Sequence, residues 1–589
     1  MSEQAAKIVV QKYGGSSLAD AEKIRAVAER ICGARAAGAD VVVTVSAMGD
    51  RTDELIDLAR NVVGSAGPPD PRELDTLLST GELVSSALVA MAVRARGNDV
   101  VSLSGIQAGI KTDSRHGSAR IADIDPTRIK QELARGRIVI VAGFQGLSEM
   151  NDVTTLGRGA SDTTAVALAA SLGAERCEIY TDVDGIYTTD PRLVPDARKL
   201  DSIEYGDMLE LASLGAKMNP RSIELGAIYG VPIMVASTFE DVPGTLIHGD
   251  KLAGSKTMEI RNAVTAVESE TGVAQIAVSG LANREGLAAE LFDLVAGEGI
   301  NVDVIIANDQ PGVNASDLVF TVGAEDAERA AAAARRLPGA LVQAKSELAK
   351  VSIAGTGMQN SPGYAARMFR ALANASVNIH LIATAEVRIT CVIDAESLEV
   401  AASALSQEFD TTRIITTPSD PGATGAKGRF RSEHPVTGIA IDRSVARISV
   451  RGVRDRPGIA AGLFEPLADA GISVDLMVQT AASGGMTDMA FTVAEDEADR
   501  AMKTAREQRY VEFADVICDS GLAKVSIVGA GLQYTPGQAA KMFRTLSRQG
   551  INIRAVTTAD IRITCLVDAG AIGAAARSLH DAFDLAAPG

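Results

Sequence analysis

The sequence predicts an α/β protein in two parts: a mostly parallel sheet sandwiched by helices, followed by four ferredoxin-like βαββαβ modules. Two observations predict this. Short β-branched runs alternate with helical patterns up to about residue 245, and the remainder of the chain repeats itself. At 589 residues the chain exceeds one hydrophobic core, because a domain takes roughly 100–200 residues. Several domains are therefore expected.

The first part, residues 1–250, carries the pattern of a parallel sheet with helices. A helix is expected from Asp20 to Gly38, where apolar residues recur at helical spacing and form one stripe that can lie on a sheet. The stripe consists of Ile24, Val27, Ala28, Ile31 and Cys32. The expected strands are KIVVQKYGG, DVVVTVSAM, DVVSLSG, RIVIVAGF, CEIYTDVDG and VPIMVAS. Each ends in turn residues or Gly, where a parallel sheet exposes its ligand-binding edge.

The C-terminal part is internally duplicated. AKVSIAGTGMQNSPGYAARMF from Ala349 returns as AKVSIVGAGLQYTPGQAAKMF from Ala523, and QIAVSGLANREGLAAELF from Gln275 returns as RISVRGVRDRPGIAAGLF from Arg447. Each copy reads strand, Pro/Gly turn, amphipathic helix and strand, with further strand and helix signals after it, which is a βαββαβ pattern. We expect modules 1 to 4 at 265–345, 346–415, 443–518 and 519–589, with a polar, Pro- and Gly-rich linker at 416–442.

Composition narrows the class of function. The formal net charge is −18, from 57 basic and 75 acidic residues, and no Lys/Arg-rich run occurs, so nucleic acid is not an expected partner. No apolar run approaches the about 20 residues of a membrane span, and the N-terminus lacks a signal-peptide pattern. We therefore expect a cytoplasmic protein that does not bind a membrane. The cysteines lack disulfide or zinc spacing and are expected to be buried hydrophobes: Cys32, Cys177, Cys391, Cys518 and Cys565.

Two Gly-containing turns are candidates for binding anions. KYGGSS, Lys12 to Ser17, follows the first expected strand; its glycines would let backbone N–H groups approach phosphate, and Lys12 would add a charge. The alternative is an ordinary strand-to-helix turn, and no Walker-type motif occurs. In GRGASD, Ser161 and Asp162 fall where helix N-caps are expected, and capping alone would explain them. Arg158 suits bidentate capture of a carboxylate or phosphate.

Further polar segments follow expected strands or turns. YTDVDGIYTTDPR, Tyr180 to Arg192, begins as a strand and becomes a loop that is either solvated or a nucleotide platform. On the second interpretation Tyr187 lies along the base or ribose, and Arg192 meets phosphate. STGE, ending at Glu82, and SAMGDRTDEL, containing Ser46 and Thr52, place polar groups beside turns, where each could equally be a cap.

In this order the motifs resemble those of the aspartate kinases of the amino-acid kinase superfamily, which read approximately KFGGTS, SAMxxxTxxL, STGE, GRGGSD and YTDVDGxYTxDPR. The resemblance covers essentially the first 250 residues, with Tyr13, Ala160 and the Gly49–Arg51 turn as departures. It implies the amino-acid kinase fold and transfer of phosphate from ATP, with Mg²⁺, to the side-chain carboxylate of aspartate. The product, 4-phospho-L-aspartate, begins lysine, threonine and methionine biosynthesis in that family.

The resemblance also implies site residues. For ATP they are Lys12, Tyr13, Gly14, Gly15, Ser46, Thr181, Asp182, Tyr187, Arg192, Lys217 and Met218. For aspartate they are Thr52, Glu82, Arg158, Gly159, Ser161 and Asp162, with Lys12, Arg158 and Asp162 as the catalytic groups. No metal ligand is expected from side chains alone. A carboxylate nucleophile is ionised at neutral pH, since its usual pKa is about 3.9, so alignment and charge cancellation are needed rather than a general base.

The βαββαβ modules resemble ACT domains, which bind amino acids at interfaces between modules. The implied effectors are lysine, threonine or both, and the implied assembly is a homo-oligomer, a dimer. The second half of the duplication is expected to hold the better-preserved effector site: Asp455, Arg456, Pro457, Gly458, Ile459, Ala460, Ser473, Val474, Asp475 and Gln479, with Asn552, Ile553 and Thr558 from the last module. The first half offers Asn283, Asp303, Asn378, Ile379 and Thr384.

Two rival functions remain open from the sequence. One is another kinase of the superfamily, acting on acetylglutamate, glutamate or a nucleotide monophosphate; STGE, GRGASD and the ACT modules argue against it. The other is an amino-acid sensor with an inactive kinase part. Retention of Lys12, Arg158 and Asp162 argues against that, because a degenerate site has no physical need for them.

Overall fold

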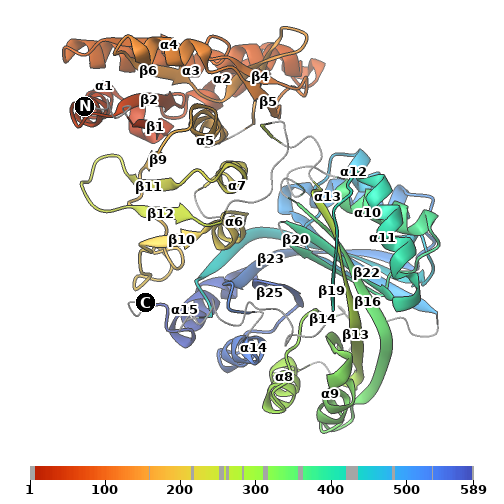
Figure 1. The fold of residues 1–589 in the computed structure, drawn as a ribbon. Coiled ribbons are helices and arrows are strands. Elements are labelled where there is room, and N and C mark those ends of the chain that lie inside the picture. The colour runs from red at the N-terminus through yellow and green to blue at the C-terminus, as the bar shows by residue number, and fades with distance from the viewer. Residues whose placement is uncertain are drawn as a thin grey trace. The chain divides into compact units, whose positions relative to one another are not determined.

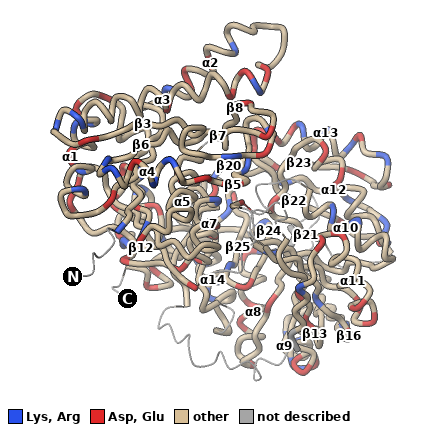
Figure 2. The backbone as a smooth tube through the Cα atoms, turned by 45° about the horizontal axis from the view of Figure 1, so that its top comes forward, with Lys and Arg blue, Asp and Glu red and all other residues tan. Residues whose placement is uncertain are grey.

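The chain forms two compact units. The computed structural model describes residues 7–157, 159–213, 218–250, 258–259, 264–281, 284–309, 316–355, 358, 363–385, 387–418, 435–479, 485–532 and 535–586. Unit 1 comprises Met1–Ile186 and Lys199–Arg261, and unit 2 comprises Tyr187–Arg198 and Asn262–Gly589. Each unit is described by itself. Figure 2 shows that Lys and Arg residues alternate with Asp and Glu residues along the backbone of both units.

Unit 1 contains the expected mostly parallel sheet, with strand order β10-β12-β11-β9-β1-β2-β6-β3 (Figure 1). Its strands are β1 (Ile8–Tyr13), β2 (Asp40–Val45), β3 (Val100–Leu103), β6 (Ile138–Ala142), β9 (Arg176–Thr181), β10 (Ser202–Glu204), β11 (Ile233–Ser237) and β12 (Thr245–His248). A small second sheet has β4 (Ile110–Thr112), β5 (Ile121–Ile124), β7 (Gln145–Ser148) and β8 (Val153–Thr155). All six strands expected from sequence are confirmed.

Helices cover the larger sheet on both faces. They are α1 (Ala21–Ala36), α2 (Arg51–Val63), α3 (Pro71–Ala95), α4 (Thr127–Ala134), α5 (Ser161–Leu172), α6 (Tyr205–Ser213) and α7 (Pro220–Tyr229). The apolar stripe expected in α1 is confirmed: Ile24, Val27, Ala28 and Ile31 are buried against β1 and β2. Asp20 caps this helix by accepting hydrogen bonds from two backbone N–H groups.

Alternation along the strands assigns one face to each helix layer. Val41, Val43 and Val45 of β2 join the core under α1 and α3, so the side chains between them point to the opposite face, where α5 lies. Helix α3 is long and apolar enough to cross a membrane by length and composition alone, but 44% of its apolar stretch is buried inside the protein.

Unit 2 repeats the order strand, helix, strand, strand, helix four times on long shared strands (Figure 1), and among the described residues the fourth repeat ends at α15 without the expected last strand. The first half has β13 (Ala266–Leu281), α8 (Leu287–Gly297), β14 (Ile305–Asp309), β15 (Ser316–Gly323), α9 (Ala327–Ala334), β16 (Leu341–Ala354), α10 (Tyr364–Asn374), β17 (Leu381–Ala385), β18 (Arg388–Asp394), α11 (Leu398–Glu408) and β19 (Ile414–Pro418). The second half has β20 (Gly438–Arg454), α12 (Ile459–Asp469), β21 (Met477–Gln479), β22 (Met486–Ala494), α13 (Ala498–Glu507), β23 (Asp515–Val528), α14 (Gln538–Arg548), β24 (Ala555–Ala559), β25 (Arg562–Asp568) and α15 (Ile572–Ala582).

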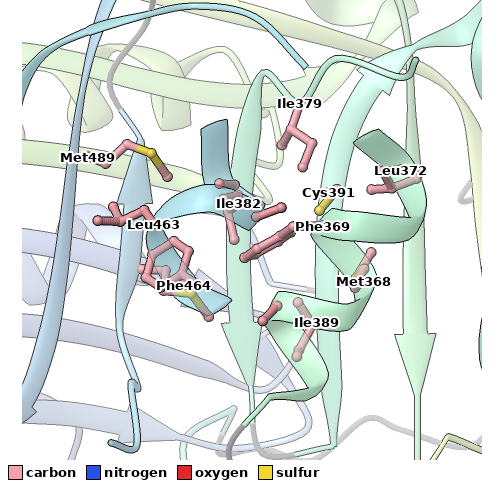
Figure 3. Packing of buried hydrophobic residues seen from close by; sticks show 14 of the residues in the cluster. Met368, Phe369, Leu372, Ile379, Ile382, Ile389, Cys391, Leu463, Phe464 and Met489 are labelled. Atoms are coloured by element: carbon pink, nitrogen blue, oxygen red, sulfur yellow. The ribbon is translucent and has the colours of Figure 1, made fainter. Parts of the chain in front are cut away.

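The duplicated halves pair crosswise. Strand β14 of module 1 pairs with β24 of module 4, and α8 packs on α14. In the same way α10 of module 2 packs on α12 of module 3, where Phe369 and Phe464 lie 5.6 Å apart in a shared apolar core (Figure 3). A separate inner cluster joins strands of modules 1, 2 and 3. The four modules therefore form two helix-covered pairs with apolar strand faces between them.

Several module boundaries expected from sequence fall inside strands of the structure. The predicted boundaries after residues 345 and 518 fall inside β16 and β23, because each of these strands serves both modules of its half. The predicted linker 416–442 overlaps β19 at one end and β20 at the other. A composition rich in Pro and Gly could not show these strand ends, since their pairing partners are far away in the chain.

Candidate functional site

The candidate catalytic site lies at the carboxyl edge of the large sheet in unit 1. Strands β9, β1 and β2 are adjacent and parallel, so Thr181, Gly14 and Ser46 emerge at the same edge. Gly143, directly after β6, belongs to this edge too, and a Cβ on it would lie 3.1 Å from the Cβ of Ser161 at the start of α5. The structure therefore brings together the turns that the sequence motifs singled out.

Lys12 and Asp162 form the central ion pair of this edge. The Lys12 Nζ lies 2.6 Å from Asp162 Oδ1, and their side chains are only 11% and 10% exposed. Capping does not explain Asp162: Ala160 is the N-cap of α5, without a side-chain hydrogen bond. Because α5 begins here, its free N–H groups and positive dipole end also favour an anion.

Tyr13 does not offer its ring to a ligand. Its side chain is fully buried under α1 and α3, stacks on Tyr180 at 5.1 Å, and donates a hydrogen bond to Gln11. Adjacent residues of a strand point to opposite faces, which is why Lys12 reaches the α5 face while Tyr13 enters the core. The predicted ATP-binding residue Tyr13 thus turns its side chain into the core, and its backbone lies at the edge of the sheet beside Gly14.

Gly15 is required by close packing of two turns. A Cβ on it would lie 2.7 Å from the carbonyl oxygen of Ala47, and the Gly15 carbonyl accepts a hydrogen bond from Gly49. Gly14 is the more open position, where a Cβ would lie 3.4 Å from Lys12 Nζ. Of the two glycines, Gly14 is thus the one beside the charge that would meet a phosphate.

Glu82 lies inside helix α3, not beside a turn as the sequence suggested. Helix α3 can pass close under Ala47 because position 81 is Gly: a Cβ there would lie 2.9 Å from that of Ala47. Glu82 Oε1 accepts a hydrogen bond from Ala47 N at 3.0 Å, and Glu82 Oε2 has no partner within the described ranges. Burial raises the pKa of Glu82 to about 7. A buried carboxylate short of one partner suits a ligand ammonium.

Two other predicted substrate residues, Thr52 and Gly159, lie in α2 and directly before α5. Thr52 lies in the first turn of α2, which packs on α3. A Cβ on Gly159 would lie 3.5 Å from the side-chain amide of Asn219, which is the N-cap of α7 and follows the buried Met218. The substrate turn and the predicted nucleotide segment are thus adjacent. Arg158 and Lys217 lie outside the described residues.

The YTDVDGIYTTDPR motif is divided between the two units. Thr181 ends β9 in unit 1 and donates a hydrogen bond to the exposed Asp182. The segment from Tyr187 to Arg198 belongs to unit 2, where Thr188 lies 3.0 Å from the buried His580 of α15. Arg192 is 80% exposed and donates two hydrogen bonds to Asp190. Tyr187 and Arg192 are therefore not placed beside Lys12 within one unit.

The predicted effector residues fall into two sets that differ from the sequence interpretation. Asn378 donates to Asp455 at 3.4 Å, Gln479 donates to the Ile379 carbonyl at 3.3 Å, and Thr384 donates to the Asp475 carbonyl at 2.9 Å. All of these contacts join module 2 to module 3. Thr558 instead donates to the carbonyl of Asp303 and accepts from Ile305 N, which joins module 4 to module 1.

A single site within the second half is therefore wrong. Asn552, Ile553 and Thr558 belong to the pair of modules 1 and 4, whereas Asp455 and Gln479 belong to the pair of modules 2 and 3. The two members of one half cannot face each other because they are successive stretches of the same long strands. The residue Asn283 lies outside the described residues.

A pocket opens between modules 2 and 3. Its lining includes Tyr364, Thr384, Phe464, Ser473, Val474 and Asp475. The helix N-terminal glycine Gly363 of module 2 lines it, with a Cβ position 3.6 Å from Ala468 of module 3. Four predicted effector residues, Thr384, Ser473, Val474 and Asp475, line this pocket, whereas Arg456 and Pro457 are exposed.

Two predicted effector carboxylates already hold a lysine. Lys350 pairs with Asp303, and Lys524 pairs with Asp475. Burial raises the pKa of Asp475, but the charges of Lys524 and Arg562 outweigh it, so the pKa of Asp475 lies below its usual value. These carboxylates differ from Glu82, which has no cation beside it in the part of the chain that the structure describes.

Sequence reasoning missed Arg221 and Glu259. Arg221 follows Met218 and Asn219 in the segment that was singled out, but its partner Glu259 lies 38 residues later and receives two hydrogen bonds of 2.8 Å. No local pattern links the two positions. Asp75, buried in α3 and accepting from Thr155 of β8, was missed for the same reason.

Comparison with known proteins defines the class first. The amino acid kinase family matches residues 7–237, and the ACT domain family matches residues 351–409, 448–508 and 525–583. Module 1 has no match there but shows the same order of elements. The fold and site thus define an amino-acid kinase with C-terminal ACT domains.

Individual relatives narrow the class. Aspartokinase from Mycolicibacterium smegmatis is 47% identical over 410 residues, covering 68% of this chain and 96% of the relative. Aspartokinase from Corynebacterium glutamicum is 46% identical with the same coverage. The crystal structure of aspartate kinase from Synechocystis matches 98% of both chains at 38% identity with a TM-score of 0.83. The chain belongs to the aspartokinase family, whose members phosphorylate the side-chain carboxylate of aspartate.

Proposed function

We propose that Lys12 and Gly14 hold the transferring phosphate of ATP while Glu82 and Arg158 hold the aspartate. The observation that carries this assignment is the nearly buried Lys12–Asp162 pair at the carboxyl edge of the sheet. The further aspartate residues are Thr52, Gly159, Ser161 and Asp162. The further nucleotide residues are Gly15, Ser46, Thr181, Asp182, Lys217 and Met218, with Tyr187 and Arg192 as predictions from the motif.

The chemistry requires positioning more than proton transfer. A carboxylate with a pKa of about 4 is ionised at neutral pH, and its oxygen forms a bond to the γ-phosphorus as the bond from that phosphorus to the β,γ-bridging oxygen breaks and ADP leaves. Two anions must approach, so Lys12 and the N-terminus of α5 offset their repulsion. Asp162 fixes the direction of the Lys12 ammonium. Glu82 accepts the α-ammonium of aspartate, and Arg158 pairs with its α-carboxylate.

We also infer that Mg²⁺ arrives with ATP. Among the described residues no cluster of three metal-binding side chains occurs, so phosphate oxygens and water would supply most ligands. When bound, the ion neutralises charge on the β- and γ-phosphates.

Replacing Lys12 tests the catalytic assignment. Lys12→Ala should lower kcat with aspartate, ATP and Mg²⁺ by about 10²–10³-fold, as for loss of one charge-stabilising donor. Lys12→Ala/Asp162→Ala avoids an unpaired buried carboxylate and should be equally inactive. Lys130→Ala, an exposed lysine of α4, is the control. Normal turnover by a folded Lys12→Ala variant would remove the assignment, and turnover of acetylglutamate would favour the rival kinase.

We propose that the pocket between modules 2 and 3 binds an amino-acid effector, lysine or threonine. Its hydroxyl groups, on Tyr364, Thr384 and Ser473, can meet an ammonium, and the N-terminus of α10 at Gly363 can meet a carboxylate. Titration calorimetry should use the full chain, because a fragment of the second half would lack Thr384 and Tyr364. Absence of heat with both amino acids would contradict the proposal.

We further propose a homodimer in the cytoplasm. The support for this proposal is the resemblance of the modules to ACT domains. Light scattering of the full chain should report twice the 61.0 kDa chain mass.

A further inference from the structure

The short linker segment Met258–Glu259 is fastened to unit 1. Met258 N donates to the Ala122 carbonyl at 3.2 Å and Glu259 N donates to the Ile121 carbonyl at 2.9 Å, which ties the segment along β5. The Tyr229 hydroxyl donates to the Met258 carbonyl at 3.2 Å. Glu259 is only 7% exposed. Unit 2 begins three residues later, at Asn262, so this segment is the last described anchor before the ACT modules.

The Glu259 carboxylate is held by one guanidinium. Arg221 donates through Nε and Nη2 at 2.8 Å each, a bidentate geometry, and the Arg221 side chain is 12% exposed. The carboxylate also accepts from Ile121 N at 2.5 Å. A buried carboxylate satisfied in this way holds its partner in one orientation.

The same guanidinium supports the substrate turn. Arg221 also donates to the carbonyl of Leu156 and, at 2.9 Å, to that of Ala119. Leu156 stands two residues before Arg158. Arg221 itself lies in the first turn of α7, directly after Asn219, which lies against Gly159. The Arg221 side chain thus joins Glu259 to the residue before the turn that carries Arg158, and its neighbour Asn219 lies on the other side of that turn.

We propose that Arg221 and Glu259 are positioning residues that set the geometry of the Arg158 turn and make it sensitive to the linker. Fixing the Leu156 carbonyl restricts the directions available to the following residues. A displacement of Glu259 would therefore reach the Leu156 carbonyl, next to the aspartate site, through Arg221. This inference rests on the proposed role of Arg158 in binding aspartate.

The test compares two buried glutamates. Glu259→Gln keeps the shape but removes the charge that holds Arg221. We expect the KM for aspartate to rise about tenfold, with kcat and the KM for ATP changed less than threefold, and inhibition by lysine or threonine to weaken. The matched control is Glu132→Gln in α4, whose carboxylate is fully buried and pairs with Arg128, Arg135 and Arg137.

Two further variants keep the result decisive. Arg221→Lys, which loses the bidentate fork, should give the same split between KM and kcat, and Glu259→Asp should restore part of the aspartate affinity. If Glu259→Gln loses thermal stability as Glu132→Gln does but keeps the wild-type KM for aspartate, the proposal is overturned. Arg158→Lys separates the two hypotheses: an unchanged KM for aspartate in that variant would overturn the proposed function instead.

Discussion

The carboxylate of Glu82 in unit 1 and the carboxylates of Asp303 and Asp475 in unit 2 have different partners. In unit 1, Glu82 is 3% exposed, accepts one backbone hydrogen bond and has no resident cation among the described residues. In unit 2, Asp303 and Asp475 each hold a lysine, Lys350 and Lys524, at equivalent positions of the duplicated halves. The first arrangement leaves a place for a ligand ammonium, and the second is already complete.

This difference indicates which carboxylate can bind a ligand and which carboxylates hold modules together. A carboxylate kept from water without a cation costs free energy in the free protein, and an arriving ammonium recovers that cost. A carboxylate with its own lysine gains nothing from a second ammonium. We therefore expect Asp303 and Asp475 to join the modules of each half, with effector specificity coming from their neighbours. Each prediction below tests this contrast.

The largest effect is expected from Lys524→Met. Asp475 would lose its main cation, and the free energy of unfolding should fall by about 3 kcal/mol, as when one partner of a buried pair is removed. Chemical denaturation monitored by circular dichroism measures this. Lys503→Met, an exposed lysine of α13, is the control and should change stability by less than about 0.5 kcal/mol. Equal losses of stability in both variants would show that the pair of Lys524 with Asp475 contributes no more than an exposed ion pair.

Replacement of Glu82 is expected to change the free energy of unfolding in the opposite direction. Glu82→Gln keeps the acceptor for Ala47 N but removes an unpaired charge, so stability should stay equal or rise at pH 8. The KM for aspartate should increase by about 30-fold, matching about 2 kcal/mol for a hydrogen bond to a charged group. Steady-state kinetics with varied aspartate measure this. A destabilised variant with unchanged KM would place Glu82 with the structural carboxylates.

The raised pKa of Glu82 predicts a pH dependence. Aspartate affinity should fall as pH decreases through about 7, because the protonated carboxyl no longer attracts an ammonium. The stability term has the reverse direction: the folded state binds a proton between the usual value of 4.5 and about 7, so this contribution declines as pH rises across that window. Profiles of kcat/KM for aspartate should lose this inflection in Glu82→Gln, and an inflection kept by that variant belongs to another group.

The smallest effect is expected at Gln479. Its amide donates to Ile379 across modules 2 and 3, whereas Ala307 occupies the equivalent place of module 1. Gln479→Ala should weaken effector binding by about 1 kcal/mol, roughly fivefold, without changing activity in the absence of effector. Titration calorimetry on the full chain measures it. An unchanged affinity would move the effector site to the pair of modules 1 and 4, where Ala307→Gln is the reciprocal variant.

Much of the fold could be read along the chain. The strands of unit 1, the helix α1 and the βαββαβ pattern were predicted because strand and helix periodicity are local properties. Helix α3 was less accessible: STGE resembles a turn, and only its closeness to Ala47 explains a glycine inside the helix. The catalytic turns were found by motif, and Arg221 and Glu259 were missed because their link is tertiary.

The sequence by itself determined the alternation of strands and helices, the duplication and the residues of the catalytic turns, because each of these depends on neighbouring residues in the chain. Only the tertiary structure decided which face of β1 Lys12 and Tyr13 occupy, which lysine neutralises Asp475, and that module 1 pairs with module 4 and module 2 with module 3. The physical reason is that near-identical repeats offer near-identical surfaces. Their choice of partner depends on long shared strands that separate neighbours in the chain and bring distant copies together.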